Sequence, residues 1–320
     1  MCGCLRLRIE WVSLIENCWT LSFGGVSQTV VSRFVLLAIQ NGSRWGMTWN
    51  VVSSCVLAAL LLAVGGSVSG QMAPVWERAH AHNDYEHPRP LLDALDQGFC
   101  SVEADIWLVG GELLVAHDLE QATPGRTLEK LYWEPLRERV QRHGGRVHPD
   151  GPTFTLLIDV KSEAEAAYRV LRTQLATHAS FLTRFSATET MPGAVTVILS
   201  GNRPTATVAA ETSRWCAIDG RLDDLTAVPP PSVHLMPLVS QSWTPTFSWF
   251  EDGVLPETDR AALRRWVAVA HQQGRRLRFW GVPDQPFAWK ELYTAGVDLI
   301  NTDNLQGLNA FLQQASTEKP

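Results

Sequence analysis

From Trp76 onward the chain alternates short apolar runs with longer amphipathic stretches, and this alternation constrains its fold more than any other feature. The amphipathic stretches repeat their apolar residues every three or four positions, which is typical of helices that pack one face on a sheet. Buried strands separated by such helices indicate a parallel α/β protein. About eight strand–helix units in roughly 250 residues are the usual content of a closed barrel. We therefore predict a single (β/α)8 TIM-type barrel.

The boundaries of the expected elements follow from the same pattern. The strands are expected at Trp76–Ala81, Phe99–Leu108, Phe154–Val160, Val195–Ser200, Cys216–Asp219, His234–Val239, Leu277–Val282 and Val297–Asn301. The clearest helices are expected at Arg89–Gln97, Glu163–Thr177, Asp259–Gln273 and Phe287–Ala295. The stretch Leu222–Ser232 ends in three prolines and is expected to be a loop without a helix.

The first 70 residues have a different character. The run Cys55–Val64 is apolar, small residues follow it, and no charged residue lies between Trp45 and Trp76. An apolar core of about ten residues that ends in small residues is typical of a secretory signal peptide, and it is shorter than the roughly 20 residues of a membrane-spanning helix. We predict a leader over 1–70, with the signal peptide at about 47–70, and the barrel over 71–320. The protein is expected to be exported, to the periplasm or the medium; a membrane anchor formed by an uncleaved leader is the alternative.

The net charge narrows the choice of partners. The whole chain carries −6; residues 1–70 hold four arginines and two glutamates, a net of +2, so the remaining 250 residues carry −8. A net-acidic body has no general attraction for a polyphosphate, which excludes nucleic acid as a partner. We expect a monomer that acts on a small molecule or a lipid.

Polar residues that do not suit a core gather at the ends of the first three expected strands. They are His80 and His82 at the end of the first, Glu103 and Asp105 on the second, His117 after a hairpin at Gly110-Gly111, and Asp159 and Lys161 on the third. Alternate residues of a strand share a face, so Glu103 and Asp105 point to the same side. The carboxyl ends of the strands form the mouth of a barrel, where the active sites of such barrels lie.

These residue types indicate a cation and an anionic ligand. Burying one unpaired charge costs several kcal/mol. The oxygen ligands of Glu103, Asp105 and Asp159 suit one hard divalent cation, Mg²⁺ or Ca²⁺, better than zinc. Lys161 can offset the carboxylate charge and bind a phosphate oxygen. Two histidines beside such a centre can act as a general base and a general acid near neutral pH.

Several strings of residues are recognisable as a set. The pattern resembles the phospholipase-C-like phosphodiesterase superfamily, which includes glycerophosphodiester phosphodiesterases and sphingomyelinase D enzymes. The residues that carry this resemblance are His82, Glu103-x-Asp105, His117-Asp118, Asp159-x-Lys161, Gly296–Asp298 and Asn301–Asp303. The strings His80–Tyr85, Arg89–Leu95 and Ser101–Ile106 are most similar to the altered-inheritance-of-mitochondria protein six family within it.

The resemblance implies a TIM-type barrel that hydrolyses or cyclises a glycerophosphodiester or a phospholipid-type substrate with one Mg²⁺ or Ca²⁺. It matches His82 and His117 to the catalytic pair, and Glu103, Asp105 and Asp159 to the metal ligands. Lys161 matches a phosphate-contacting lysine and Trp280 a pocket aromatic. We add Asn83 and Asn202 as candidate contacts to the phosphate or the head group.

Two other functions compete with this interpretation. One is a catalytically inactive barrel that only binds a ligand. The other is a zinc hydrolase of the amidohydrolase type, in which His80 and His82 would be the metal ligands; otherwise His80 is expected to pack beside the site. Two expectations concern the remaining residues. The histidines at 143, 148, 178 and 271 are expected to face solvent. The aromatic residues at 243, 247, 249 and 250 are expected to form an apolar lip for a lipid or aromatic ligand, and transient contact with a membrane surface is a further expectation.

Overall fold

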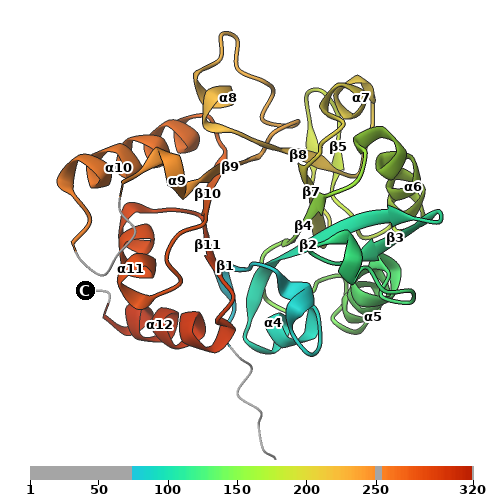
Figure 1. Cartoon of the computed structure of the whole chain (residues 1–320), viewed down its shortest axis with the longest axis horizontal. Helices are drawn as coiled ribbons and strands as arrows, with labels where there is room; N and C mark the ends of the chain where they lie inside the picture. Colours follow the sequence, from blue (N-terminus) through green and yellow to red (C-terminus); the bar gives the residue numbers. More distant parts are fainter. Residues whose placement is uncertain (1–73, 249–253, 319–320) are drawn as a thin grey trace, which may run out of the picture. The chain divides into compact units, whose positions relative to one another are not determined.

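The fold is a closed barrel of eight parallel strands (Figure 1), which confirms the predicted architecture. The computed structural model describes residues 74–248 and 254–318. Around the barrel the strands follow the order β1, β11, β10, β9, β8, β7, β4 and β2, and β2 pairs with β1 to close the circle. Their bounds are β1 Trp76–Ala81, β2 Phe99–Val109, β4 Phe154–Val160, β7 Val195–Gly201, β8 Ala217–Gly220, β9 Leu238–Ser242, β10 Arg276–Trp280 and β11 Leu299–Thr302.

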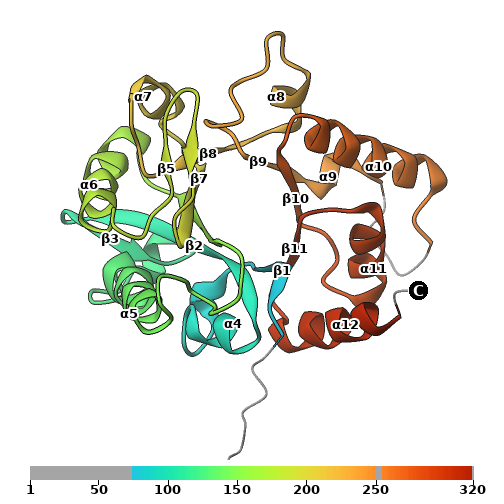
Figure 2. The same ribbon diagram turned by 180° about the vertical axis from the view of Figure 1, so that it is seen from behind.

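Helices form an outer layer around these strands (Figures 1 and 2). They are α4 Leu92–Asp96, α5 Glu134–Arg142, α6 Ala164–Thr177, α7 Thr205–Ala210, α8 Leu222–Thr226, α9 Trp243–Thr246, α10 Glu257–Gln272, α11 Pro286–Ala295 and α12 Leu305–Thr317. Short helical turns lie at Asp84–Glu86, Leu119–Gln121 and Glu129–Trp133. The predicted hairpin is present, because β3 (Glu112–Val115) pairs antiparallel with β2, and a small hairpin joins β5 (Arg184–Phe185) to β6 (Thr190–Met191).

Some predicted boundaries are wrong. A helix, α8, occupies the start of the stretch expected to be a loop, because Leu222 and Leu225 bury one helical turn after Arg221. β9 begins at Leu238, four residues later than predicted. Pro237 precedes it, and a proline cannot donate to a strand ladder.

The barrel has one apolar layer outside its wall and one inside. Along β4, Leu156 and Ile158 belong to the large core under the helices, whereas Leu157 points the opposite way. Leu157 packs with Ile198, Leu238 and Leu299, all buried, and these four residues form a separate cluster. Because inward and outward side chains alternate on every strand, this small cluster fills the interior. The polar residues of the same inward rows lie beyond it, toward the carboxyl ends of the strands.

The predicted signal peptide and most of the leader lie outside the described residues. Within residues 74–248 and 254–318, no helix has the length and apolar character needed to cross a membrane.

Candidate metal centre and active site

Three predicted ligands lie together at the mouth of the barrel. Glu103 and Asp105 sit on the inward face of β2, and the strand register places Asp159 of β4 directly beside Asp105. One carboxylate oxygen from each residue lies within 4.8 Å of the others. Within the part of the chain that the structure describes, this is the one group of three acidic, histidine or cysteine side chains close enough to share a cation.

Glu103 is held by two side chains from other strands. Its Oε2 accepts a hydrogen bond from Nη2 of Arg278 on β10 and lies 3.3 Å from Nε2 of His80 on β1. Arg278 is fixed in turn, because its Nε donates to Oδ1 of Asn301 at 2.9 Å. Burial works to raise the pKa of Glu103, but the charge of Arg278 and the bond to His80 outweigh it and hold the pKa well below its usual value.

The two aspartates are each held through a single oxygen. Oδ2 of Asp105 accepts from the Tyr85 hydroxyl at 2.7 Å and lies 3.1 Å from both Nδ1 of His117 and Nζ of Lys161. Oδ2 of Asp159 accepts from the same Lys161 at 3.2 Å. The other oxygen of each residue, Oδ1, is buried and has no hydrogen-bond partner among the described residues.

The protein therefore neutralises the cluster only in part. Three carboxylates face two cationic side chains, Lys161 and Arg278, which leaves one net negative charge. Burial, followed by the charge of Glu103, raises the pKa of Asp105 to about 6, and burial also raises the pKa of Asp159. Two buried acceptor oxygens without partners and an excess of negative charge fit a hard cation.

A glycine leaves room for one of these unpartnered oxygens. Gly201, at the end of β7, has φ +65°, and a Cβ at this position would lie 1.9 Å from Oδ1 of Asp159. Any larger residue would push the Asp159 carboxylate out of the cluster.

The predicted catalytic histidines flank the carboxylates. His82 follows β1, and its Nδ1 lies 2.9 Å from Oδ1 of Asp303, which follows β11. His117 follows β3 and contacts Asp105 through its own Nδ1 at 3.1 Å. The imidazoles are 29% and 50% exposed. A carboxylate on Nδ1 fixes the ring and leaves Nε2 to exchange a proton with a ligand.

The surroundings of His82 change its pKa. Burial works to lower the pKa of His82, but the hydrogen bond to Asp303 and the charge of Glu103 outweigh it, and the pKa is raised. His82 consequently keeps its proton to a higher pH than an ordinary histidine.

His80 has the supporting position expected of it. Its Nδ1 lies 2.6 Å from Oγ of Ser101, and its Nε2 faces Glu103. Burial and the charge of Arg278 lower the pKa of His80 to about 4, so the ring is neutral at physiological pH. Both nitrogens are engaged, and the carboxylate group described above includes no histidine, so this geometry gives the zinc-hydrolase alternative no support.

The four predicted substrate contacts lie around the mouth, some of them in structural hydrogen bonds. Lys161 bridges Asp105 and Asp159, and Trp280 ends β10 with 42% of its surface exposed. Asn83 has the left-handed φ of 46°, and its Oδ1 lies 2.8 Å from the Tyr85 hydroxyl oxygen. The Asn202 amide donates to the carbonyls of Lys161 and Ser162, which fixes the loop after β7 against the end of β4.

Sequence reasoning missed Tyr85 and Arg278. The Tyr85 hydroxyl lies at the junction of Asn83, Asp105 and His117. Its sequence signal is only its place in the string that follows His82. Arg278 stands between Leu277 and Phe279, both fully buried, and an arginine at an inward position of an expected strand was the available signal.

Two expectations about residues away from the site are wrong. His148 and His178 are buried, and His178 pairs with Glu129 at 3.0 Å. Trp243 and Phe247 are also buried, because both pack edge-on against Phe279 of β10. They belong to the core and form no apolar lip; the aromatics at 249 and 250 lie outside the described residues.

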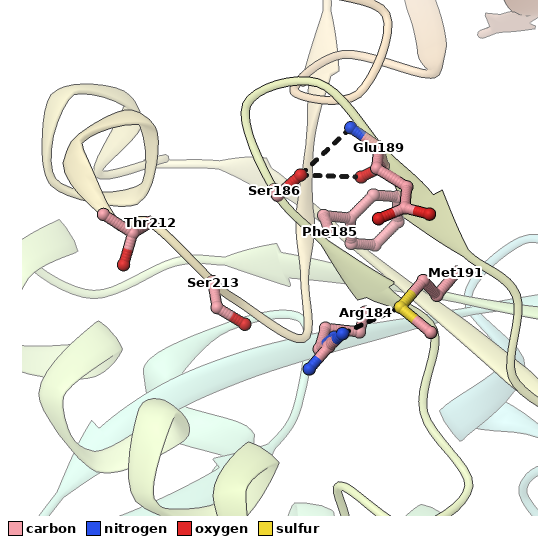
Figure 3. Close-up of a pocket in the computed structure, with 7 residues that line it drawn as sticks. All are labelled: Arg184, Phe185, Ser186, Glu189, Met191, Thr212 and Ser213. Atoms are coloured by element: carbon pink, nitrogen blue, oxygen red, sulfur yellow. Dashed lines mark hydrogen bonds between the residues drawn. The ribbon is translucent and has the colours of Figure 1, made fainter.

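A separate pocket of about 190 Å³ lies at the β5–β6 hairpin (Figure 3). It is lined by Arg184, Phe185, Ser186, Glu189, Met191, Thr212 and Ser213. Bridges from Leu182 to Val195 and from Phe185 to Arg214 place this hairpin beside the amino ends of β7 and β8. The pocket is therefore at the opposite end of the barrel from the carboxylates.

Comparisons with known proteins identify the family of the chain. The model of the AIM6-like phosphodiesterase domain matches residues 67–219, and that of the glycerophosphoryl diester phosphodiesterase family matches residues 276–306. The chain is 31% identical over 264 residues to an altered inheritance of mitochondria protein 6 homolog from Arthroderma benhamiae, covering 72% of this chain and 82% of that protein. It is 30% identical over 280 residues to altered inheritance of mitochondria protein 6 from Eremothecium gossypii, covering 74% and 70%.

Solved structures with a similar fold include two phosphodiesterases. One is a glycerophosphodiester phosphodiesterase from Agrobacterium tumefaciens, with 16% identity, a TM-score of 0.46, and 74% of this chain and all of that chain covered. The other is an Oleispira antarctica phosphodiesterase in complex with sn-glycerol-3-phosphate, with 18% identity, a TM-score of 0.45, and 74% and 96% covered.

Proposed function

Since the chain belongs to the altered inheritance of mitochondria protein 6 family, we propose that it is a metal-dependent phosphodiesterase. The reaction is hydrolysis or cyclisation of a phosphoric diester, with a glycerophosphodiester or a phospholipid-type molecule as substrate. One observation carries the proposal. Asp105 and Asp159 each place a buried oxygen without a hydrogen-bond partner among the described residues in the carboxylate cluster. Two histidines, each held through Nδ1, flank this cluster.

The residues of the chain have distinct roles in this reaction. Glu103, Asp105 and Asp159 would hold one divalent cation, Mg²⁺ or Ca²⁺, which would supply positive charge to offset that of the phosphate. Lys161 lies among the same carboxylates and offers a second positive charge to the phosphate. Trp280, Asn83 and Asn202 lie around the mouth, where the rest of the substrate is bound.

The two histidines move the protons. His117 takes a proton through Nε2 from the attacking hydroxyl, which belongs to the substrate or to water. His82, whose pKa is raised, gives a proton to the leaving alcohol oxygen. Attack by a substrate hydroxyl yields a cyclic phosphate, and attack by water yields a phosphomonoester and the free alcohol.

The test is the turnover of bis(p-nitrophenyl) phosphate and a panel of glycerophosphodiesters after chelation and re-addition of Mg²⁺ or Ca²⁺. Loss of one general acid or base costs about 10²- to 10⁴-fold in rate, so we expect losses of that size on the glycerophosphodiesters for both His82→Ala and His117→Ala. His87→Ala, which lies outside the cluster, is the matched control and keeps its rate. Phosphorus NMR distinguishes a cyclic from a ring-opened product.

Two results would overturn the assignment. Near-wild-type turnover in both histidine variants would remove these residues from the mechanism. Cation-dependent binding of the diesters without cleavage of any of them would favour the inactive, ligand-binding barrel.

We also propose that the protein is exported by a signal peptide at about 47–70 and acts as a monomer. The charge-free segment from Trp45 to Trp76, with its run of about ten apolar residues, supports export. Amino-terminal sequencing of the mature protein tests the cleavage, and an amino terminus at residue 47 or before it would contradict it.

A further inference from the structure

Two arginines stand side by side on the wall of the mouth beyond the carboxylates. Arg203 lies two residues after β7, and Arg221 directly follows β8. Both are anchored to Asp219, which is fully buried on β8. Since β8 is separated from β4 by β7 alone, the arginines lie next to the wall that carries Asp159 and Lys161.

The anchoring leaves most of each guanidinium available. Nη1 of Arg203 donates to the carbonyl of Asp219 at 2.7 Å. Nη1 of Arg221 donates to Oδ2 of Asp219 at 2.9 Å and to the carbonyl of Gly220 at 2.8 Å. Nη2 and Nε of both arginines have no hydrogen-bond partner in the part of the chain described, and they are not among the buried polar atoms without partners. These nitrogens therefore remain open to a ligand.

The two guanidinium groups are close enough to repel each other. Burial, and then the charge of Arg221, lowers the pKa of Arg203, and the charges of Asp219, Asp224 and Asp159 act in the opposite direction. Arg203 thus lies within electrostatic reach both of its neighbour and of the carboxylate cluster. The loop that carries it is pinned to the end of β4 through Asn202. Asp219 and Asp224 balance part of this positive charge, and the free Nη2 and Nε donors of two guanidinium groups fixed in this way form a favourable place for an anion.

We propose that Arg203 and Arg221 form a second oxyanion subsite, which recognises a carboxylate or a phosphomonoester on the alcohol portion of the phosphodiester. The subsite is distinct from the scissile phosphate, which faces Lys161 and the two histidines. Neighbouring strands are about 5 Å apart, so a group two strands from β4 is roughly 10 Å away along the wall. A ring alcohol such as inositol, with a second phosphate across the ring, spans roughly such a distance. The identity of the complete substrate rests on the proposed function, whereas the anion preference of this wall does not.

The experiment compares two matched pairs of ligands. Glycerophosphoinositol 4-phosphate differs from glycerophosphoinositol by one phosphate, and glycerophosphoserine differs from glycerophosphoethanolamine by one carboxylate. For each ligand, kcat/KM is measured in the presence of Mg²⁺, and Kd is measured by calorimetry in the same buffer. The wild-type protein should prefer the charged member of at least one pair, by about tenfold or more, because hydrogen bonds to charged groups are among the stronger ones. The pair that shows the preference identifies the oxyanion as phosphate or carboxylate.

Variants connect this preference to the arginines. Arg203→Gln and Arg221→Gln should reduce the preference about tenfold, and Arg203→Lys should restore part of it. Arg169→Gln, at an exposed position on α6, is the control and should leave the preference unchanged. If Arg221→Gln does not fold, the two Arg203 variants suffice, because Arg203 bonds only to a backbone carbonyl.

The outcomes separate the subsite from the proposed function. Equal losses on the charged and uncharged members of each pair in Arg203→Gln would overturn the subsite and leave a structural role. A wild-type protein without preference in either pair would overturn it as well. Preferential binding of the charged members without turnover of any ligand would contradict the phosphodiesterase and support the subsite.

Discussion

Replacing Gly201 by alanine tests the geometry of the cation site most directly. The new Cβ would lie 1.9 Å from Oδ1 of Asp159 and 2.6 Å from the carbonyl oxygen of Val160. Real Cβ atoms stay at least 3.0 Å from such neighbours, so the Asp159 oxygen must move by about 1.1 Å. The Val160 carbonyl belongs to the β4 ladder and cannot move away without breaking it, so the side chain of Asp159 is displaced.

The size of the effect follows from two separate costs. An alanine at φ +65° costs about 1–2 kcal/mol of backbone strain. Overpacking adds about 1–3 kcal/mol, so the free energy of unfolding should fall by about 2–5 kcal/mol. A ligand oxygen moved by about 1 Å should also weaken cation binding by about tenfold or more. Mg²⁺ should suffer more than Ca²⁺, because its octahedral shell tolerates less variation.

Gly144 provides a matched control for the strain. It has φ +64°, and nothing lies within 4 Å of a Cβ built on it. Gly144→Ala should therefore lose only the strain energy and bind cations like the wild type. Chemical denaturation gives the stability of both variants, and calorimetric titration with MgCl₂ and CaCl₂ gives their affinities. If Gly201→Ala matched Gly144→Ala in both measurements, the position assigned to the Asp159 oxygen would be wrong.

Three further variants probe the surroundings of the cluster. Arg278→Met should cost about 3–5 kcal/mol of stability by leaving the buried Glu103 charge alone, and the Arg278→Met/Glu103→Gln double variant should recover much of it in denaturant titrations. Tyr85→Phe should lower the free energy of unfolding by only about 0.5–1.5 kcal/mol in the same assay, the usual value of one hydrogen bond. A larger loss would mean that the other partners of Asp105 do not compensate for the missing hydroxyl. Asp303→Asn should lower the pKa of His82 in an NMR titration without divalent cations. Because the wild-type pKa of His82 is raised, the His82–Asp303 pair contributes its full stability at pH values below the usual histidine pKa. This contribution is lost as the pH rises through the raised pKa. Asp303→Asn should therefore be less stable than the wild type at about pH 5 and equally stable at about pH 9.

The sequence predicted the barrel and the carboxylate cluster because both depend on local order. The bounds of β1 and β4 agree with the expected residues. Glu103 and Asp105 share a face within one strand, and the neighbouring β4 brings Asp159 beside them by its register alone. Residues on adjacent strand ends are thus found from spacing.

Contacts between strands that are far apart in the sequence could not be predicted from residue spacing. Arg278 and Glu103 are 175 positions apart, and only the closing of the barrel brings them together. The burial of Trp243 depends on Phe279 of another strand, so its sequence neighbourhood gave the misleading impression of an exposed lip. The single turn of α8 is too short for apolar periodicity to appear.

The apolar cluster of Leu157, Ile198, Leu238 and Leu299 has a kinetic consequence. These buried side chains fill the barrel beneath the carboxylates, so a ligand can approach the cluster only from the carboxyl ends of the strands. In the proposed reaction, the substrate enters and both fragments of the cleaved diester leave on this one side of the barrel. A fragment that stays at the cluster should therefore inhibit competitively with the substrate.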